Sequence, residues 1–258
     1  MTTWKCTRYA VEGKAAWITL DSPENRNALS VDLVRELSVH LRNAIDDPAV
    51  RAIVVTGAGR AFCAGADLKN RGDMGGSGDT NPFVDILKLM RDGPKPVIAA
   101  VNGAAFGGGI GLVAAADIAV SAESAKFSFS EVRLGLIPAM ISVVVLPKLG
   151  EHQTMRLFLT GERFEAPRAL EYGLLHRVAP DDGLAAAVQE EVDAIAKGGP
   201  IAIAEAKRLV RTVARANEVD AFRYAEAKIA ALFASEEAAE GMAAFIGKRS
   251  PSWVADEG

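Results

Sequence analysis

The sequence predicts an α/β fold that ends in a separate layer of helices. Short apolar runs of strand length alternate with longer stretches of helix length, the pattern of strand–helix units packed around a shared sheet. Half of the 258 residues are hydrophobic, which is enough to bury a sizeable core. From residue 200 onward the composition shifts to helix formers. We therefore expect an α/β core over residues 1–199 and a helical region over residues 200–258.

The first strand–helix unit follows the N-terminal segment. Residues 14–20, KAAWITL, read as a strand, and the polar stretch 21–25 ends it as a turn. Ser30 can then cap a helix. Charged residues, among them Glu36, fall outside the apolar stripe of that helix. The stripe itself follows spacings of three and four: Val34, Leu37, Leu41 and Ile45.

Later units repeat the pattern less strictly. The apolar runs Ala52–Thr56 and Val97–Val101 read as buried strands, and a stretch of helix length follows each of them. Three helices are expected after Pro200. The remaining expected elements are helices over 83–90 and 110–116 and short strands over 118–120 and 126–129.

A glycine-rich hinge joins the strand at 97–101 to the helix that follows it. Gly103, Gly107, Gly108 and Gly109 allow positive φ angles and close approach of another molecule to the main chain. A helix that begins at these glycines presents N–H groups without intrahelical partners at the positive end of its dipole. Such groups can stabilise an oxygen that becomes negative during a reaction. The alternative is that the glycines only let the helix pack tightly on the strand.

A second turn of small residues follows the strand at 52–56. It reads RAFCAGADLK over residues 60–69, and Ala64, Gly65 and Ala66 again leave the backbone accessible. Two such turns can supply two N–H donors to one oxygen, which is the usual composition of an oxyanion hole.

Five stretches of this chain resemble the crotonase family, the enoyl-CoA hydratase/isomerase superfamily. They are ITLDSPENRNALS (18–30), AFCAGADLK (61–69), VNGAAFGGGIGL (101–112), AKFSFSEVRLGLIP (125–138) and EGMAAFIGKRSPSW (240–253). The resemblance implies a coiled ββα core whose C-terminal helices build a trimer, or a dimer of trimers.

The same resemblance implies the site residues. The backbone N–H groups of Ala66 and Gly108 would hold the thioester carbonyl oxygen, and Glu131 would be the catalytic carboxylate. Coenzyme A enters as part of the substrate, so no separate cofactor is expected. Its binding residues would be Ala64, Asp67, Leu68 and Lys69, with Phe245 and Lys248 from the C-terminal helix.

The chain departs from the family pattern at two places. Many hydratases of the family carry a second glutamate two residues after the last glycine of the GGG run, and the matching residue here is Gly111. A PGAGGTQ-like segment is replaced by residues 138–142, PAMIS. With FGGGIGL, the segment LGLIPAMIS is similar to the bacterial methylglutaconyl-CoA hydratase branch.

These features predict hydration of a 2-enoyl-CoA thioester, with Glu131 as the acid–base. Three alternatives stay open. The first is an isomerase, although Ala139 stands where its usual acidic residue would be. The second is another acyl-CoA reaction that uses the same oxyanion hole, such as thioester hydrolysis or dehalogenation. The third is an acyl-CoA binder that has lost turnover.

Composition and motifs narrow the partners and the compartment. A net charge of −4 provides no basic field for nucleic acid, and no run approaches the ~18 apolar residues that suggest a membrane span. Two cysteines are too few for a disulfide framework, so we expect a cytoplasmic protein in which Cys63 is a small buried residue. No metal site, P-loop or G-x-S-x-G elbow is found in the sequence. His40, His152 and His176 are expected to be structural or solvent-facing.

The stretch 71–80, RGDMGGSGDT, is polar and rich in glycine. It is expected to be a mobile surface loop, which could be either a lid over the acyl group or a plain connector.

Overall fold

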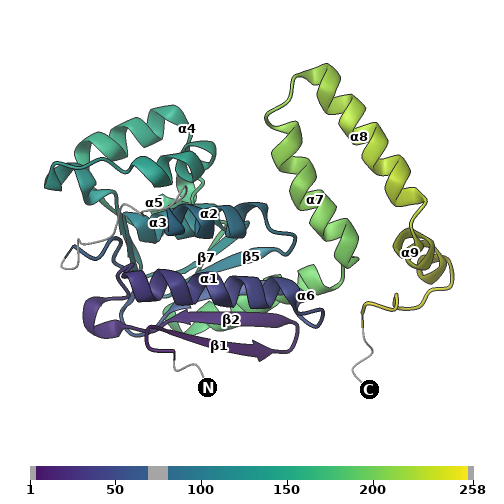
Figure 1. Cartoon of the computed structure of the whole chain (residues 1–258), viewed down its shortest axis with the longest axis horizontal. Helices are drawn as coiled ribbons and strands as arrows, with labels where there is room; N and C mark the ends of the chain where they lie inside the picture. The colour runs from purple at the N-terminus through teal and green to yellow at the C-terminus, as the bar shows by residue number, and fades with distance from the viewer. Residues whose placement is uncertain (1–3, 69–80, 255–258) are drawn as a thin grey trace.

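The computed structural model describes residues 4–68 and 81–254, which form two β-sheets with helices around them (Figure 1). Lys69 and the stretch 71–80, predicted as a loop or lid, lie outside the described residues. Among the helices of this described part, none has the length and apolarity that crossing a membrane requires.

The larger sheet has six strands in the order β1-β2-β3-β5-β7-β10. Its first two strands form an antiparallel hairpin, and the strands from β2 onward are parallel. The hairpin strand β1 was not predicted. The bounds are β1 Thr7–Glu12, β2 Ala15–Leu20, β3 Ala52–Gly57, β5 Val97–Val101, β7 Ile118–Ala122 and β10 Arg177–Ala179.

The smaller sheet has four strands in the order β4-β6-β8-β9. Its strands are only three residues long, and β9 pairs antiparallel with β8. The bounds are β4 Ala61–Cys63, β6 Ala104–Phe106, β8 Lys126–Ser128 and β9 Arg163–Glu165.

Successive turns of the chain contribute one strand to each sheet. The pairs β3 and β4, β5 and β6, and β7 and β8 each place their first strand in the larger sheet and their second in the smaller one. The helices α2 (Pro82–Asp92), α3 (Gly108–Ala115) and α4 (Ala139–Thr160) follow these pairs in chain order. This is the coiled ββα core, so the predicted fold is confirmed.

Helix α1 (Val31–Asp46) begins where the sequence predicts, because the Ser30 hydroxyl accepts a hydrogen bond from the backbone N–H of Leu33 at 3.2 Å. Its apolar stripe packs into the core, but Glu36 is buried as well. The Glu36 carboxylate accepts two backbone N–H groups and one hydroxyl from residues 5–7 at 2.9–3.0 Å. The buried face is therefore wider than the stripe, because the chain entering β1 covers it.

The glycines at the start of α3 act mainly through close packing. Of the four hinge glycines, only Gly107 has a positive φ, of 48°. A Cβ on Gly103 or Gly109 would lie 2.5 or 2.4 Å from a backbone oxygen of the β4 segment. Only Gly107 therefore needs the backbone freedom of glycine. Gly103 and Gly109 instead allow close contact with the β4 segment of the smaller sheet.

Helices α4, α5 (Ala166–Glu171) and α6 (Leu184–Ala196) were not predicted. Pro147 and a bend at Gly150, with a φ of 70°, interrupt the periodicity of α4. Helix α6 packs Val188 and Val192 against one face of the larger sheet, opposite the main core. Alternate residues of β3 serve the two faces, since Ile53 and Val55 enter the main core while Ala52 and Val54 meet α6.

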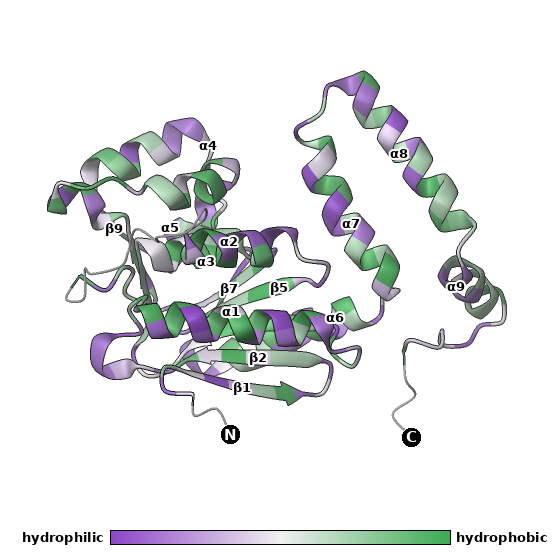
Figure 2. Cartoon of the chain, viewed as in Figure 1, coloured by the Kyte–Doolittle hydropathy of each residue, from purple (hydrophilic) through white to green (hydrophobic). Residues whose placement is uncertain are grey.

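The three helices predicted after Pro200 are α7 (Pro200–Val213), α8 (Glu218–Phe233) and α9 (Glu236–Ile246). They form an arm that stands away from the rest of the chain (Figure 1). Helix α7 is joined to the core by ion pairs with Asp117, the residue that directly precedes β7. Hydrophobic residues recur along all three helices of the arm (Figure 2). Several of their side chains are exposed in the single chain: Val210, Phe222, Ile229, Phe233, Phe245 and Ile246.

Candidate active site

The two small-residue turns predicted from the sequence meet in the structure. A Cβ on Gly65 would lie 2.8 Å from the Phe106 carbonyl oxygen and 3.4 Å from the backbone nitrogen of Gly108. Gly65 has a φ of 89°, so glycine satisfies both the backbone angle and the contact. The segment Ala64–Ala66 therefore rests directly on the N-terminus of α3.

Residues 26–29 hold this segment in place. The Ala64 N–H donates to the Arg26 carbonyl at 3.0 Å, and the Leu29 N–H donates to the Gly65 carbonyl at 2.8 Å. Asn27 is completely buried, and its side-chain amide donates to the carbonyls of Ala58 and Ala61 at 2.9 and 2.8 Å. These bonds use the carbonyl of Gly65 and the N–H of Ala64, and none of them uses the N–H of Ala66.

The N–H groups of Ala66 and Gly108 are available as donors, as an oxyanion hole requires. Within the described residues, neither donates to a backbone carbonyl outside a regular helix or strand, whereas the neighbouring Gly107 N–H is bound to the Ser128 carbonyl at 3.0 Å. Gly108 is the first residue of α3, where N–H groups have no intrahelical acceptor and the helix dipole is positive. An oxygen held here would gain both hydrogen bonds and dipole stabilisation.

Cys63 packs against the first turn of α3. It ends β4 and is completely buried, and a Cβ on Gly109 would lie 3.0 Å from the Cys63 Cβ. Burial raises the pKa of the Cys63 thiol to about 12. The expectation of a small buried residue at this position is met.

Glu131 lies beside the same glycines. It belongs to the short 3₁₀ helix η3 (Ser130–Leu134), which follows β8. A Cβ on Gly107 would lie 2.8 Å from the Glu131 Oε1 atom, so the carboxyl group packs on bare backbone. Its Oε2 atom is buried and has no hydrogen-bond partner among the described residues. Burial raises the pKa of Glu131, against the smaller opposing effect of a backbone hydrogen bond.

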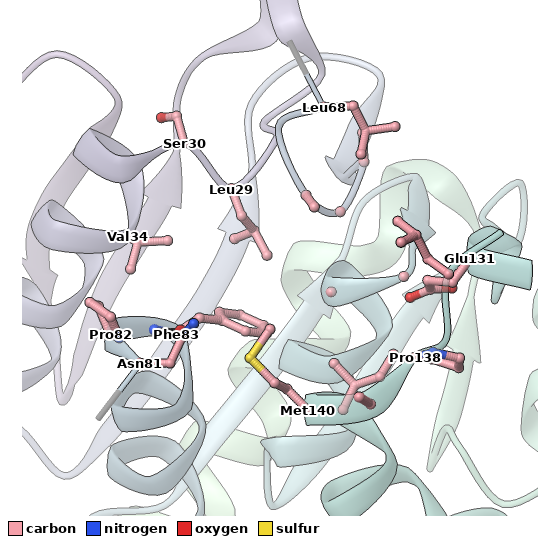
Figure 3. Close-up of a pocket in the computed structure, with 18 of the residues that line it drawn as sticks. Leu29, Ser30, Val34, Leu68, Asn81, Pro82, Phe83, Glu131, Pro138 and Met140 are labelled. Carbon is pink, nitrogen blue, oxygen red and sulfur yellow. Dashed lines mark hydrogen bonds between the residues drawn. The ribbon is translucent and has the colours of Figure 1, made fainter. Parts of the chain in front are cut away.

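These groups face one cavity of about 730 Å³. Figure 3 shows Glu131 and Pro138 on one side of it and Val34, Pro82 and Phe83 on the other, with Met140 between them. Most of the lining is aliphatic or aromatic, from α1, α2, η3, the start of α4 and the segments next to them: Leu29, Val31, Val34, Val39, Leu68, Phe83, Leu134, Leu136, Ile137, Met140 and Ile141. The cavity thus combines a polar corner with an apolar body, as ligand sites commonly do.

Ile141 fills the space in which a side chain at residue 111 would lie. A Cβ on Gly111 would lie 2.3 Å from the Ile141 Cγ2 atom and 3.1 Å from its Cβ, so no side chain fits at residue 111 while Ile141 holds this position. Neither Ala139 nor Met140 supplies a carboxylate, and Glu131 is the single acidic residue among the described residues that line the cavity.

The remaining predicted site residues fall in three places. Ala64 and Leu68 line the cavity, and Asp67 is buried next to them without being part of its lining. Phe245 is 86% exposed on α9, and Lys248 follows the same helix, so both lie on the arm and outside the cavity of their own chain. Lys69 is outside the described residues.

Sequence reasoning missed Asn27, Phe83 and Ile141. Asn27 was included in no element, although its φ of 57° is a conformation that asparagine tolerates better than most residues. Phe83 was read only as the start of a helix. Ile141 stands within PAMIS, the segment that departs from the family pattern, and its pairing with Gly111 could have been suspected from the coincidence of the two departures.

The predicted histidines have structural surroundings. His40 is buried between the rings of Trp4 and Tyr9, with centroid distances of 4.5 and 5.2 Å. His176 Nδ1 accepts the Ala119 N–H at 3.1 Å, which joins it to β7. His152 lies within α4, just beyond the bend, and none of the three lines the cavity.

Comparisons with known proteins agree with this architecture. The sequence profile of the enoyl-CoA hydratase/isomerase family matches residues 11–256. Carnitinyl-CoA dehydratase of Escherichia coli is 36% identical over 253 residues, which cover 93% of this chain and 95% of that protein. An enoyl-CoA hydratase structure from Shewanella pealeana superimposes with a TM-score of 0.91 at 33% identity, covering 97% of this chain and 96% of that chain. Pseudomonas aeruginosa AtuE gives a TM-score of 0.90 at 32% identity, covering 97% of this chain and 100% of that chain. The chain therefore belongs to the enoyl-CoA hydratase/isomerase family, the crotonase superfamily.

Proposed function

We propose that the protein hydrates the 2,3 double bond of an enoyl-CoA thioester, with the N–H groups of Ala66 and Gly108 as the oxyanion hole and Glu131 as the acid–base. The observation that carries the proposal is the packing of Glu131 against Gly107, one residue before the donor Gly108. The carboxyl group of η3 is thereby held next to the proposed oxyanion site at the start of α3.

In the first step, the Glu131 carboxylate takes a proton from water as the water oxygen bonds to C3 of the substrate. The electron pair of the C2–C3 double bond moves toward the thioester carbonyl, whose oxygen becomes negative at the two N–H donors. Loss of one such donor typically costs about 2.7–4 kcal/mol of transition-state stabilisation, so this term is a large part of the catalysis.

In the second step, protonated Glu131 delivers its proton to C2 and the enolate collapses to the saturated thioester. The proton balance closes on Glu131, which takes and returns one proton. Because the described lining offers no second carboxylate, both steps occur on the face of the substrate that Glu131 contacts. The proposal therefore requires syn addition of water. A raised pKa suits this double role, since a carboxyl group is then both a better base and an accessible acid near neutral pH.

The proposal extends to the binding of coenzyme A. Ala64 and Leu68 would contact the pantetheine arm at the cavity mouth, and Lys69, Phe245 and Lys248 would contact the adenine and phosphates. Because Phe245 lies outside the cavity of its own chain, we propose that it reaches coenzyme A bound to another copy, within a trimer or a dimer of trimers. The exposed apolar side chains of α7–α9 support this assembly, since contiguous apolar surface usually marks an interface.

A panel of 2-enoyl-CoA esters tests the activity directly. Hydration removes the absorbance of the conjugated thioester and adds the mass of one water, whereas an isomerase shifts the double bond without a change of mass and a thioesterase releases free coenzyme A. Reaction in deuterium oxide should give the single diastereomer of syn addition. Binding without turnover of any ester would favour the non-catalytic alternative.

The narrower likeness to methylglutaconyl-CoA hydratases stays a prediction. The same panel addresses it when it includes glutaconyl esters, whose tail ends in a carboxylate.

A further inference from the structure

The direction of one proposed oxyanion donor is set by the peptide group that carries it. The Ala66 N–H and the Gly65 carbonyl belong to the same peptide unit, which is planar and trans, so the two groups point in opposite directions. The Leu29 N–H donates to that carbonyl at 2.8 Å, and Leu29 pairs with Ala66 in an isolated parallel bridge. Because its carbonyl is bound to Leu29, the peptide must present the Ala66 N–H away from Leu29.

Gly65 is the residue at which this peptide could turn over. Its φ of 89° lies in the region that glycine enters freely, so its own conformation does not fix the orientation of the peptide that follows. A flipped peptide would place a carbonyl oxygen where the donor is needed, and that oxygen would repel the negative oxygen of the transition state. The orientation therefore depends on the bond from Leu29, and on whatever holds the segment that carries Leu29.

Asn27 holds that segment. Its side chain is completely buried, and its Oδ1 atom accepts the Ser22 N–H at 2.9 Å. Its Nδ2 atom donates to the carbonyls of Ala58 and Ala61, at 2.9 and 2.8 Å. These two alanines flank the turn between β3 and β4, and β4 leads directly into Ala64. The amide of one asparagine thus joins the segment that carries Leu29 to the strand that carries the oxyanion turn.

Resting on the proposed function, we propose that Asn27 is a positioning residue, which acts through Leu29 to hold the 65–66 peptide with its N–H available to the thioester oxygen. Asn27 is not among the described residues that line the cavity, so it acts through the backbone and does not touch the substrate. A hydrogen bond to the developing oxyanion is stronger than one to the ground-state carbonyl. Loss of the asparagine amide should therefore lower turnover more than binding.

Asn27→Asp removes the donating amide but keeps the size of the side chain, an acceptor for Ser22 and tolerance of a positive φ. We expect kcat for 2-enoyl-CoA esters to fall by roughly 10–10²-fold, because a displaced donor loses part of the 10²–10³ that one oxyanion donor supplies. The dissociation constant of a saturated acyl-CoA should change by a much smaller factor. A normal kcat, or a loss confined to binding, would overturn the proposed role.

Asn102→Asp is the matched control. The Asn102 Oδ1 atom accepts the Gly57 N–H at 3.0 Å and its Nδ2 atom donates to the Gly59 carbonyl at 3.1 Å, so the same substitution removes the same kind of contact from the same β3–β4 turn. Within the described part of the chain, the side-chain bonds of Asn102 do not reach residues 26–29. Its kcat should stay close to that of the wild type. An equal loss in the two variants would show that Asn27 only stabilises the turn.

Infrared spectroscopy of a bound thioester provides a readout that a merely structural role would not change. A saturated acyl-CoA labelled with ¹³C at the carbonyl cannot be hydrated, and hydrogen bonds to its carbonyl oxygen lower the frequency of the stretching band. The band should lie below that of the free ester in the wild type and in Asn102→Asp, and return toward the free value in Asn27→Asp. Protein in excess of the measured dissociation constant keeps the ester bound, so weaker binding cannot imitate this effect.

Asn27→Gly provides a second variant should Asn27→Asp fold poorly, since glycine tolerates the φ of 57° and introduces no charge. A wild-type band position in the Asn27 variants would overturn the role of Asn27 even if hydration is observed. If the band shift is present in the wild type and lost in the variants while no enoyl ester is hydrated, the positioning role stands and the hydratase proposal fails. An unshifted band in the wild type would refute the oxyanion hole itself, and the role of Asn27 with it.

Discussion

The ammonium group of Lys207 lies 2.7 Å from the Asp117 carboxylate, and the two side chains are only 7% and 18% exposed. Lys207 also donates to the carbonyls of Met90 and Lys95, at 2.9 and 2.8 Å. The same carboxylate accepts the Val97 N–H at 2.8 Å, and so joins the starts of β5 and β7 to the arm.

Lys207→Met should destabilise the fold by about 1–3 kcal/mol, because it leaves two carbonyls without their donor, while the Asp117 carboxylate keeps its ion pair with Arg211 at 2.6 Å. Urea unfolding measures the loss. Arg208→Met is the control one residue along α7: its pair with Glu205 is 56% exposed on the arginine side, so a change within about 1 kcal/mol is expected. Equal effects of the two variants would contradict the anchoring role of Asp117.

Glu131→Gln should lower kcat for enoyl-CoA esters by at least ~10²-fold, because the variant keeps the size and hydrogen-bonding reach of the side chain but removes the base. Binding should survive, since the oxyanion donors and the apolar wall are unchanged. Steady-state kinetics and a calorimetric dissociation constant for the same esters test both halves. Near-normal turnover would exclude Glu131 as the catalyst.

The pH dependence of stability should change in the same variant. Burial raises the pKa of Glu131 above its unfolded value of 4.5, so the native protein holds this proton more tightly than the unfolded chain does. Wild-type stability should therefore fall as the pH rises from 4.5 through the native pKa. Glu131→Gln lacks this loss and should melt at a higher temperature than the wild type at neutral pH.

Thermal melts of the two proteins across the acidic range provide the measurement. The difference between their melting temperatures should shrink as the pH falls below 4.5, where Glu131 is protonated in both the native and the unfolded wild type. A constant difference would mean that the ionisation of Glu131 does not contribute. The acid limb of kcat/KM in the wild type should likewise lie above 4.5.

A double-mutant cycle tests the contact between Gly111 and Ile141. Gly111→Ala alone should destabilise by about 1–3 kcal/mol, because the new Cβ would meet the Ile141 Cγ2 atom at 2.3 Å. In the Ile141→Ala background the same change should cost clearly less, because the Cγ2 contact is gone and only the Cβ of residue 141, at 3.1 Å, remains close. An equal cost in the two backgrounds would show that some other contact excludes a side chain at residue 111.

The proposed assembly predicts a particle several times heavier than the 27.2 kDa chain in sedimentation velocity. Phe222→Asp with Ile229→Asp should shift it toward smaller species, because these exposed apolar residues lie on one face of α8. Arg223→Ala, in the same helix, should leave the mass unchanged. A monomer of the wild type at micromolar concentration would refute the assembly.

Local signals predicted a good part of this fold. The Ser30 cap, the apolar stripe of α1 and the glycine start of α3 depend on residues close together in the chain, and all three are found. Strands of three residues, such as β4 and β6, carry too little periodicity to be recognised, and the buried Glu36 is explained only by the distant segment that covers it.

The site was less accessible to such reasoning. Spacing alone could not distinguish Glu131 from a surface charge, because its burial arises from the turn that returns η3 to Gly107. The filling of the Gly111 position by Ile141 depends on a contact between two helices, which no local pattern records. The assignment of Glu131 comes from the resemblance, and the packing shows why residue 111 carries no side chain.

The burial of Cys63 makes this residue a chemical probe of local opening beside the proposed oxyanion turn. Only the thiolate reacts readily with an alkylating reagent, and this sulfur is both protonated, with a pKa of about 12, and covered by α3. Modification must therefore wait until β4 and α3 separate, so its rate at a given pH reports the fraction of molecules in which they are separated. Cys63 has no part in the proposed reaction, so its rate of alkylation measures the local stability of the site without disturbing the chemistry.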